Sequence, residues 1–143
     1  MSSSIDWENL VEAAKDVRSN AYAPYSGFAV GAAILSASGH LFVGCNVENA
    51  TYGLTICAER NAVANMVASG EREMRAIAIV TGADAPTPPC GMCRQTLAEF
   101  VLDLPVYLVS TAAGTVARAT TLAALIPNAF RGDMLPPARQ GVL

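Results

Sequence analysis

Residues 88–96 read PPCGMCRQT and place two cysteines, Cys90 and Cys93, three positions apart directly after a double proline. Proline is favoured at the start of a helix and excluded from its interior, so we expect a helix to begin here. Side chains at positions i and i+3 of a helix share one face, and both sulfur atoms can therefore reach the same point. The pair alone is compatible with a redox couple, with half of a metal site, or with two unrelated thiols.

The segments on either side of this stretch alternate between strand-like and helix-like patterns. The expected strands are residues 28–37, 40–47, 75–82, 106–110 and 116–120, and the expected helices are residues 5–20, 56–70 and 93–103, with a short closing helix within residues 121–130 that ends at Pro127. We expect Ser4 to be the N-cap of the first helix. The central connections are long enough for right-handed, parallel crossovers. The pattern predicts a single α/β domain over residues 1–143, a three-layer α/β/α fold with a mixed, about five-stranded sheet and helices on both faces.

The composition of the 143-residue chain narrows the class of protein. Hydrophobic residues make up 52% of the sequence and charged residues 15%, which excludes a disordered or fibrous protein. No window supplies the roughly 18 apolar residues that a membrane span needs, and residues 1–10 lack the pattern of a secretory signal. The net charge is −3 without any cluster of Lys or Arg, so we expect a small-molecule partner and no nucleic acid. We expect a cytoplasmic protein, whose reducing surroundings leave the four cysteines free for metal binding or catalysis.

A third cysteine, Cys57, stands near the start of the helix expected over residues 56–70, as Cys90 does in the later helix. Both helices follow strands in crossover units, so their N-termini should lie at the same edge of the sheet. Helix N-termini carry partial positive charge, which lowers the pKa of a thiol and favours the thiolate. Three thiolates suit Zn²⁺ and leave one of its four tetrahedral positions open, an arrangement typical of a catalytic zinc. Zinc at such a site lowers the pKa of a bound water to around 7.

Three other residues leave alternatives open. Cys45 could supply a fourth sulfur and close the site into a structural zinc, although its place in an apolar strand favours simple packing. His40, the only histidine, stands beside the hairpin turn, far from the expected metal edge, and we expect a solvated turn residue. Glu59 lies two positions after Cys57. Because positions i and i+2 point in nearly opposite directions on a regular helix, this spacing is only suggestive of a role at the metal.

With CAE at residues 57–59 and PCGMC at residues 89–93, the chain resembles the zinc-dependent deaminases of three-cysteine type. More narrowly, it resembles the small homotetrameric cytidine deaminases over most of its length. The resemblance follows the segments YAPYSGFAVGAAI, GCNVENATYGLTICAERNAV, AIAIV, PPCGMCRQTLAEF and LIPNAF, in the order in which that family has them. A lone CxxC pair would be weak support, whereas this combination is specific.

The resemblance implies a role for each matching residue. Cys57, Cys90 and Cys93 would bind one Zn²⁺ per chain, and Glu59 would carry the proton between water, nitrogen 3 of the pyrimidine ring and the departing ammonia. The substrate-binding residues would be Phe28, stacked on the base, Asn46 and Glu48, bound to the ribose hydroxyls, and Tyr52 and Phe130, which would complete a neighbouring subunit's site. Arg60 would offset the excess negative charge of three thiolates around one dication.

The implied function is zinc-dependent hydrolytic deamination of cytidine and 2′-deoxycytidine to uridine and 2′-deoxyuridine plus ammonia, in pyrimidine salvage, by a cytoplasmic homotetramer. The chain would be a hydrolase that acts on the C–N bond of a cyclic amidine. Two alternatives stay open: a deaminase of a cytosine-containing antibiotic resembling blasticidin S, and a non-catalytic module stabilised by zinc. The segment NVEN, residues 46–49, favours a ribosyl substrate over the antibiotic.

Overall fold

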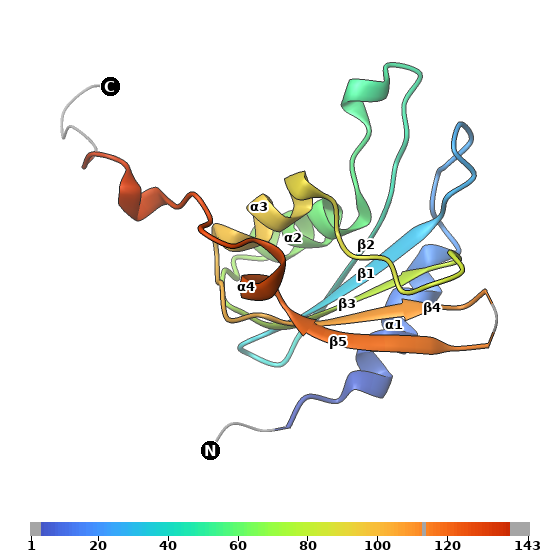
Figure 1. The fold of residues 1–143 in the computed structure, drawn as a ribbon, viewed down its shortest axis with the longest axis horizontal. Coiled ribbons are helices and arrows are strands. Elements are labelled where there is room, and N and C mark those ends of the chain that lie inside the picture. Colours follow the sequence, from blue (N-terminus) through green and yellow to red (C-terminus); the bar gives the residue numbers. More distant parts are fainter. Residues whose placement is uncertain (1–3, 113, 138–143) are drawn as a thin grey trace.

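The computed structural model describes residues 4–112 and 114–137 of the chain. Its elements are α1 (Trp7–Arg18), β1 (Val30–Ser36), β2 (Leu41–Cys45), the 3₁₀ turn η1 (Tyr52–Leu54), α2 (Ala58–Ala68), β3 (Met74–Thr81), α3 (Gly91–Ala98), β4 (Pro105–Ser110), β5 (Val116–Thr121), α4 (Leu122–Leu125) and the 3₁₀ turn η2 (Gly132–Met134) (Figure 1). The strands form one five-stranded sheet in the order β2-β1-β3-β4-β5. Strands β3 and β4 pair in parallel, and the other neighbouring pairs are antiparallel. The predicted mixed sheet is therefore confirmed.

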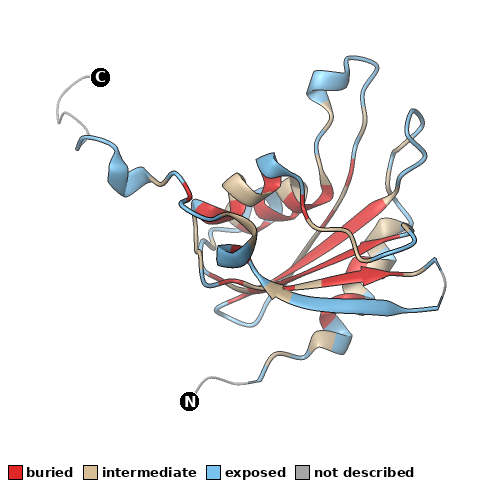
Figure 2. Ribbon diagram, in the orientation of Figure 1, coloured by how far each residue is buried: buried red, intermediate tan, exposed pale blue. Residues whose placement is uncertain are grey.

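Helices cover both faces of this sheet, as the sequence predicted. Leu10, Val11 and Ala14 of α1 are buried against one face, and residues of α2 and α3 form a second core cluster on the other (Figure 1). The central strands β1 and β3 are buried along almost their whole length, because both of their faces are covered (Figure 2). Strand β5 lies at the edge and is exposed along most of its length. None of the helices in the described part of the chain is long and apolar enough to cross a membrane.

The strand order brings the N-termini of α2 and α3 to one edge of the sheet. Strands β2 and β3 both run antiparallel to β1, so they are parallel to each other and end at the same edge. Helix α2 follows β2 and helix α3 follows β3 in the chain. Each helix therefore begins where its preceding strand ends, as the crossover argument predicted.

Helix α2 packs unusually closely on strand β2. The side-chain amides of Asn61 and Asn65 donate hydrogen bonds to the carbonyl oxygens of Cys45 (2.8 Å) and Val43 (2.6 Å). These two carbonyls flank Gly44, where a Cβ atom would lie 2.4 Å from the carbonyl oxygen at the first residue of α2. The absence of a side chain at Gly44 thus fixes how near the helix can come to the strand.

The ends of two helices differ from the predictions. Asp6, not Ser4, is the N-cap of α1, because its Oδ1 accepts a hydrogen bond of 3.0 Å from the backbone N–H of Asn9. Helix α3 ends at Ala98 rather than at residue 103, and the following turn buries Leu104 in the core. Helix α4 covers Leu122–Leu125 and ends before Pro127, as predicted. Its short length follows from the proline at position 127 and the positive φ of 53° at the next residue, which no helix can include.

Candidate active site

Three cysteine sulfurs meet where α2 and α3 begin. Cys57 is the N-cap of α2, Cys90 is the N-cap of α3, and Cys93 lies in the first turn of α3. The Cys90 Sγ atom lies 3.7 Å from that of Cys57 and 3.5 Å from that of Cys93, and all three sulfurs lie within 4.8 Å of one another. Zinc–sulfur bonds of about 2.3 Å in a tetrahedron place sulfurs about 3.8 Å apart, so the donor set fits zinc. The predicted metal cluster is thus brought together within one chain.

The electrostatic surroundings favour a negative charge on this cluster. The neighbouring Cys93 thiol and then the Arg60 guanidinium stabilise the Cys57 thiolate and lower the pKa of Cys57 to about 5, against the opposing effect of burial. The pKa of Cys93 is raised, first by its interaction with the Cys57 sulfur and second by its burial. Ionisation therefore begins at Cys57, and a dication held by all three sulfurs would displace the remaining protons.

Glu59 lies beside the sulfur cluster although its spacing from Cys57 had made this uncertain. Cys57 has φ −69° and ψ 156°, an extended backbone, so the helical rule for positions i and i+2 does not apply to it. The Glu59 side chain is buried, with 5% exposed, and its Oε2 atom accepts a hydrogen bond of 3.5 Å from Cys93 Sγ. Burial raises the pKa of Glu59, and the charge of Cys57 adds to the effect. A carboxyl group with a raised pKa binds a proton more readily than a solvated one, which suits a general acid or base.

Arg60 is tied to the same cluster. Its Nη2 atom donates to the carbonyl oxygen of Thr55 at 3.0 Å and lies 3.9 Å from Cys57 Sγ. Its buried Nε atom has no hydrogen-bond partner among the residues that the structure describes. The guanidinium is thus positioned to donate to an anionic sulfur, as the charge-compensation hypothesis requires.

A cavity of about 380 Å³ opens directly beside the sulfurs. Its lining includes Cys57, Cys90, Glu59, Phe28, Val30, Asn46, Glu48, Ile79, Thr81, Thr87 and Pro88. This volume lies within the range of about 300–1,000 Å³ that small-molecule sites occupy. Glu48 and Glu59 are its carboxylates, and no Lys, Arg or His belongs to the described lining. The cavity therefore suits a neutral or cationic small molecule better than an anion.

Asn46 and Glu48 also line this cavity, with part of their hydrogen-bonding capacity already used. The Asn46 amide accepts from the backbone N–H of Val30 (2.9 Å) and donates to the carbonyl of Phe28 (2.8 Å). The Glu48 carboxylate accepts from the backbone N–H groups of Tyr25 (2.9 Å) and Ser26 (3.1 Å) and from the Ser26 hydroxyl. An amide offers two donors and two acceptor sites, and a carboxylate about four acceptor sites, so each retains capacity for a ligand.

The structure of one chain does not bring Tyr52 and Phe130 into this cavity. Tyr52 is 74% exposed and lines a smaller neighbouring cavity of about 280 Å³, where its ring meets that of Tyr25 edge to face at 5.7 Å. Phe130 is 56% exposed, and its backbone carbonyl accepts a hydrogen bond of 2.8 Å from the side chain of Gln95. Whether these rings complete a second subunit's cavity stays a prediction.

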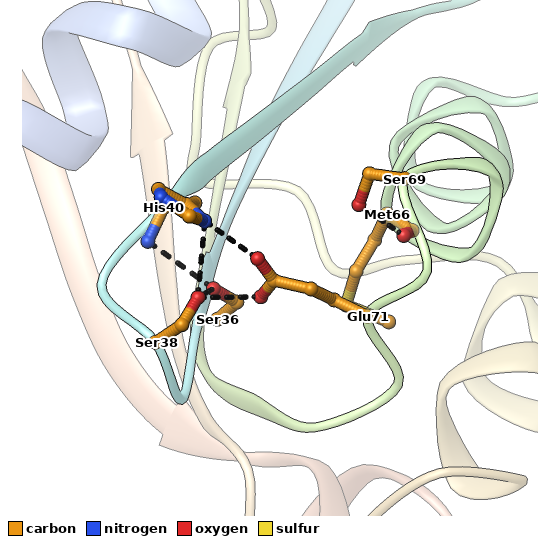
Figure 3. A network of polar contacts seen from close by, with 6 residues as sticks. All are labelled: Ser36, Ser38, His40, Met66, Ser69 and Glu71. Carbon is orange, nitrogen blue, oxygen red and sulfur yellow. Dashed lines mark hydrogen bonds and ion pairs between the residues drawn. The ribbon is translucent and has the colours of Figure 1, made fainter.

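Cys45 and His40 both lie apart from the metal cluster. Cys45 does not belong to the group of three sulfurs, so the alternative of a closed four-sulfur zinc site finds no support. The His40 side chain is 71% exposed at the far end of the β1–β2 hairpin, in agreement with the prediction of a solvated turn residue. It nevertheless has partners: its Nδ1 atom lies within hydrogen-bonding distance of Glu71 and Ser38, which also bond to each other (Figure 3).

Sequence reasoning missed several residues that shape the site. Thr81, Thr87 and Pro88 line the cavity, and the Ser26 hydroxyl holds Glu48. The side chain of Arg94 donates from Nε to the carbonyl of Pro89 (2.7 Å) and from Nη1 to that of Leu125 (2.7 Å), which joins the cysteine loop to the C-terminal segment. The partners of Ser26 and Arg94 lie 22 and 31 positions away, and no local pattern in the sequence indicates such pairs.

Comparisons with known proteins agree with this geometry. The family model described as "Cytidine and deoxycytidylate deaminase zinc-binding region" matches residues 5–109. The chain is 43% identical over 137 residues to the cytidine deaminase of Sporosarcina psychrophila, with 95% of this chain and 99% of that protein covered. It is 40% identical over 141 residues to the cytidine deaminase of Mycobacterium tuberculosis strain H37Rv, with coverages of 95% and 98%. A crystal structure of cytidine deaminase from Burkholderia pseudomallei superposes with a TM-score of 0.83 at 46% identity, covering 88% of this chain and all of that one.

Proposed function

The chain belongs to the cytidine and deoxycytidylate deaminase family, and from this membership we propose that it deaminates cytidine and 2′-deoxycytidine. The reaction is hydrolytic: water adds to carbon 4 of the cytosine ring, the bond from carbon 4 to the amino nitrogen breaks, and uridine or 2′-deoxyuridine leaves with ammonia. The observation that carries the proposal is the meeting of three sulfurs and a buried carboxyl group at one end of a cavity of about 380 Å³.

We propose that Cys57, Cys90 and Cys93 hold one zinc ion. When bound, zinc supplies a Lewis acid that brings the pKa of a water molecule to around 7. The three cysteines come from the N-termini of two helices, whose partial positive charge stabilises their thiolates. Arg60 donates to the Cys57 sulfur and offsets the net charge of −1 that three thiolates and a dication leave behind.

We propose that Glu59 is the proton carrier. Its buried carboxylate accepts the first proton that water gives up and delivers it to nitrogen 3 of the ring. It then takes the second proton from the hydroxyl group added at carbon 4 and passes it to the amino group, which leaves as ammonia while the carbonyl forms. The raised pKa of Glu59, caused chiefly by burial, supports this role because a proton carrier works best with a pKa near the working pH. Its contact with Cys93 keeps the carboxyl group beside the metal ligands.

Asn46 and Glu48, which line the cavity, are proposed to bind the sugar. Asn46 retains one donor and one acceptor after its backbone bonds, and Glu48 retains about one acceptor site, which together suit two neighbouring hydroxyl groups. Phe28, whose ring is 40% exposed and lines the cavity, is proposed to stack on the base. These polar contacts favour a ribosyl substrate and give no support to the antibiotic alternative.

A nucleoside suits this cavity better than the corresponding nucleotide. The family description includes deoxycytidylate, which carries a 5′-phosphate. The proposed sugar site instead contains the carboxylate of Glu48. The described linings of the main cavity and of the smaller one include no Lys, Arg or His. Because a phosphate would meet a carboxylate and no Lys, Arg or His in the described lining, we expect kcat/KM for the 5′-monophosphate to be lower than that for the nucleoside.

We further propose that the enzyme is a cytoplasmic homotetramer of pyrimidine salvage, in which Tyr52 and Phe130 complete neighbouring sites. Support comes from the exposure of both rings and from their position outside the chain's own main cavity. Removal of the chain from Leu125 onward should then raise KM and weaken assembly together. A fully active monomer in analytical sedimentation would contradict this arrangement.

The test of the proposed function combines two measurements on one purified sample. Zinc content should be one ion per chain, and absorbance at the cytidine band should fall with time when cytidine is added. A strong chelator should abolish the activity, and added zinc should restore it. A sample with one zinc per chain and no loss of cytidine would support the non-catalytic alternative instead.

A further inference from the structure

A single hydroxyl group connects two of the proposed substrate contacts. Ser26 lies in the loop between α1 and β1 and lines both the main cavity and its smaller neighbour. Its Oγ atom donates a hydrogen bond to Oε2 of Glu48 and accepts one of 3.0 Å from the backbone N–H of Phe28. The carboxylate proposed to bind the sugar and the residue proposed to stack on the base are therefore joined through this hydroxyl.

The Glu48 carboxylate is held almost entirely by this loop. Its Oε1 atom accepts from the backbone N–H groups of Tyr25 and Ser26, at 2.9 and 3.1 Å, and its Oε2 atom accepts from the Ser26 hydroxyl. These three bonds use about three of the four acceptor sites of a carboxylate and leave one for a ligand. The same bonds hold the pKa of Glu48 below its usual range, with the Ser26 hydroxyl as the largest cause, so the group stays ionised.

We propose that Ser26 is a positioning residue for the sugar of the substrate, acting through Glu48. The inference rests on the proposed function, because it assigns to Ser26 the task of presenting the last free acceptor of Glu48 to a substrate hydroxyl. A hydrogen bond to a charged group is stronger than a neutral one, and a carboxylate that is already oriented loses less entropy when a ligand binds. Without the hydroxyl, the carboxylate keeps only bonds to Oε1, and the N–H of Phe28 loses its partner.

The first experiment compares Ser26→Ala with the wild-type enzyme in its zinc-loaded form. We expect KM for cytidine to rise about tenfold, equivalent to about 1.4 kcal/mol, while kcat stays within about twofold and zinc content is unchanged. Ser26→Thr keeps a hydroxyl group and should restore most of the affinity. Ser19→Ala is the matched control, because the Ser19 hydroxyl donates only to the Asp16 carbonyl at the end of α1, and it should leave both constants unchanged.

The second experiment tests whether Ser26 acts through Glu48. In a Glu48→Ala background, Ser26→Ala should change KM by less than about twofold, because the group that it orients is gone. An equal tenfold rise in both backgrounds, or no rise in the wild-type background, would overturn the proposal. Failure of the proposed function is a different result, namely zinc-loaded wild-type enzyme that does not consume cytidine.

A third measurement keeps the inference testable even without turnover. The amide hydrogen of Phe28 donates to Ser26, so its exchange with solvent should be faster in Ser26→Ala than in the wild-type protein and restored in Ser26→Thr. Identical exchange rates at Phe28 in all three proteins would mean that the hydroxyl does not hold this loop, and the proposal would fail.

Discussion

Substitution of Gly44 by alanine should damage the metal centre although Gly44 touches none of the proposed ligands. A Cβ atom at Gly44 would lie 2.4 Å from the Ala58 carbonyl oxygen and 2.4 Å from the Ala62 backbone nitrogen. Both distances fall about 1 Å short of the 3.4 Å at which ordinary contact begins. The opposing atoms belong to the backbone of α2, so no change of side-chain conformation can relieve the overlap. Either the helix or the strand must therefore move.

Either movement reaches the site. A shift of α2 carries with it Cys57, its N-cap, and Glu59 in its first turn. Metal–ligand distances tolerate about 0.2 Å, so a displacement near 1 Å should lower zinc affinity by about 10–100-fold. The same displacement of Glu59 should lower kcat of the zinc-loaded enzyme by about 100-fold. A shift of β2 instead displaces Asn46, which directly follows the strand, and should raise KM with less effect on zinc.

The matched control is Gly31→Ala, which adds a methyl group on the opposite face of the sheet. There the Cβ would meet the carbonyl oxygen of Ala14 at 2.0 Å, so either α1, which carries no proposed site residue, or β1 must move. A shift of β1 would displace Val30, whose N–H holds Asn46, and would raise KM without moving the cysteines or Glu59. Overpacking costs about 1–3 kcal/mol, so both variants should lower Tm by about 3–12 °C. Only Gly44→Ala should also lower zinc affinity in a chelator competition or kcat at saturating zinc. If Gly44→Ala lowers Tm but keeps the wild-type zinc affinity, kcat and KM, the packing of α2 on β2 does not set the site.

Three further predictions concern single side chains. Glu59→Gln should retain one zinc per chain by metal analysis and lose about 10²–10⁴-fold in kcat, and a variant that kept its turnover would remove Glu59 from proton transfer. Cys57→Ala should lose the metal, whereas Cys45→Ser should keep it; a missing equivalent of zinc in Cys45→Ser would restore the four-sulfur alternative. Glu71 accepts from Ser36, His40 and Ser38, which lower its pKa from 4.5 to about 2, so its ionised form stabilises the folded state above pH 4.5. The difference in Tm between wild type and Glu71→Gln should therefore be largest near neutral pH and shrink as the pH falls from 4.5 toward 2, and a constant difference would contradict this.

Much of the fold could be predicted because local patterns and tertiary structure agree. The two hairpins, the parallel pair β3 and β4, and the position of α2 and α3 relative to the strands all follow from hydrophobic runs separated by glycine- and proline-rich turns. The ends of helices were harder to predict. Ser4 and Asp6 are both good N-cap residues two positions apart, and only the bond from Asn9 decides between them. Helix α3 ends at Ala98, and the chain then turns so that Leu104 is buried in the core. Helix propensity, which is a local property, does not include such a tertiary contact.

The sequence predicted those residues of the candidate site whose positions are set by the start of a helix. The positions of Cys57 and Cys90 as N-caps follow from strand order, and the structure brings both to the same edge. The spacing rule underestimated Glu59, because it assumes a helical backbone at Cys57, where the backbone is extended. The bond from Ser26 to Glu48 could not be predicted, since it joins two loops that only the folded sheet brings together.

The proposed metal site and the proposed sugar site are built by different parts of the fold, and this should separate the effects of mutations. The sulfurs and Glu59 lie on helices whose positions are fixed by packing on the sheet, so a change in that packing alters metal binding and kcat. Asn46, Glu48 and Phe28 lie in the loops that follow β2 and precede β1, and hydrogen bonds between those loops hold them. A change in these bonds leaves the helices in place and therefore alters KM. Gly44→Ala with a displaced helix and Ser26→Ala should thus give opposite kinetic signatures, and equal effects of both on kcat and KM would mean that the cavity moves as one rigid unit.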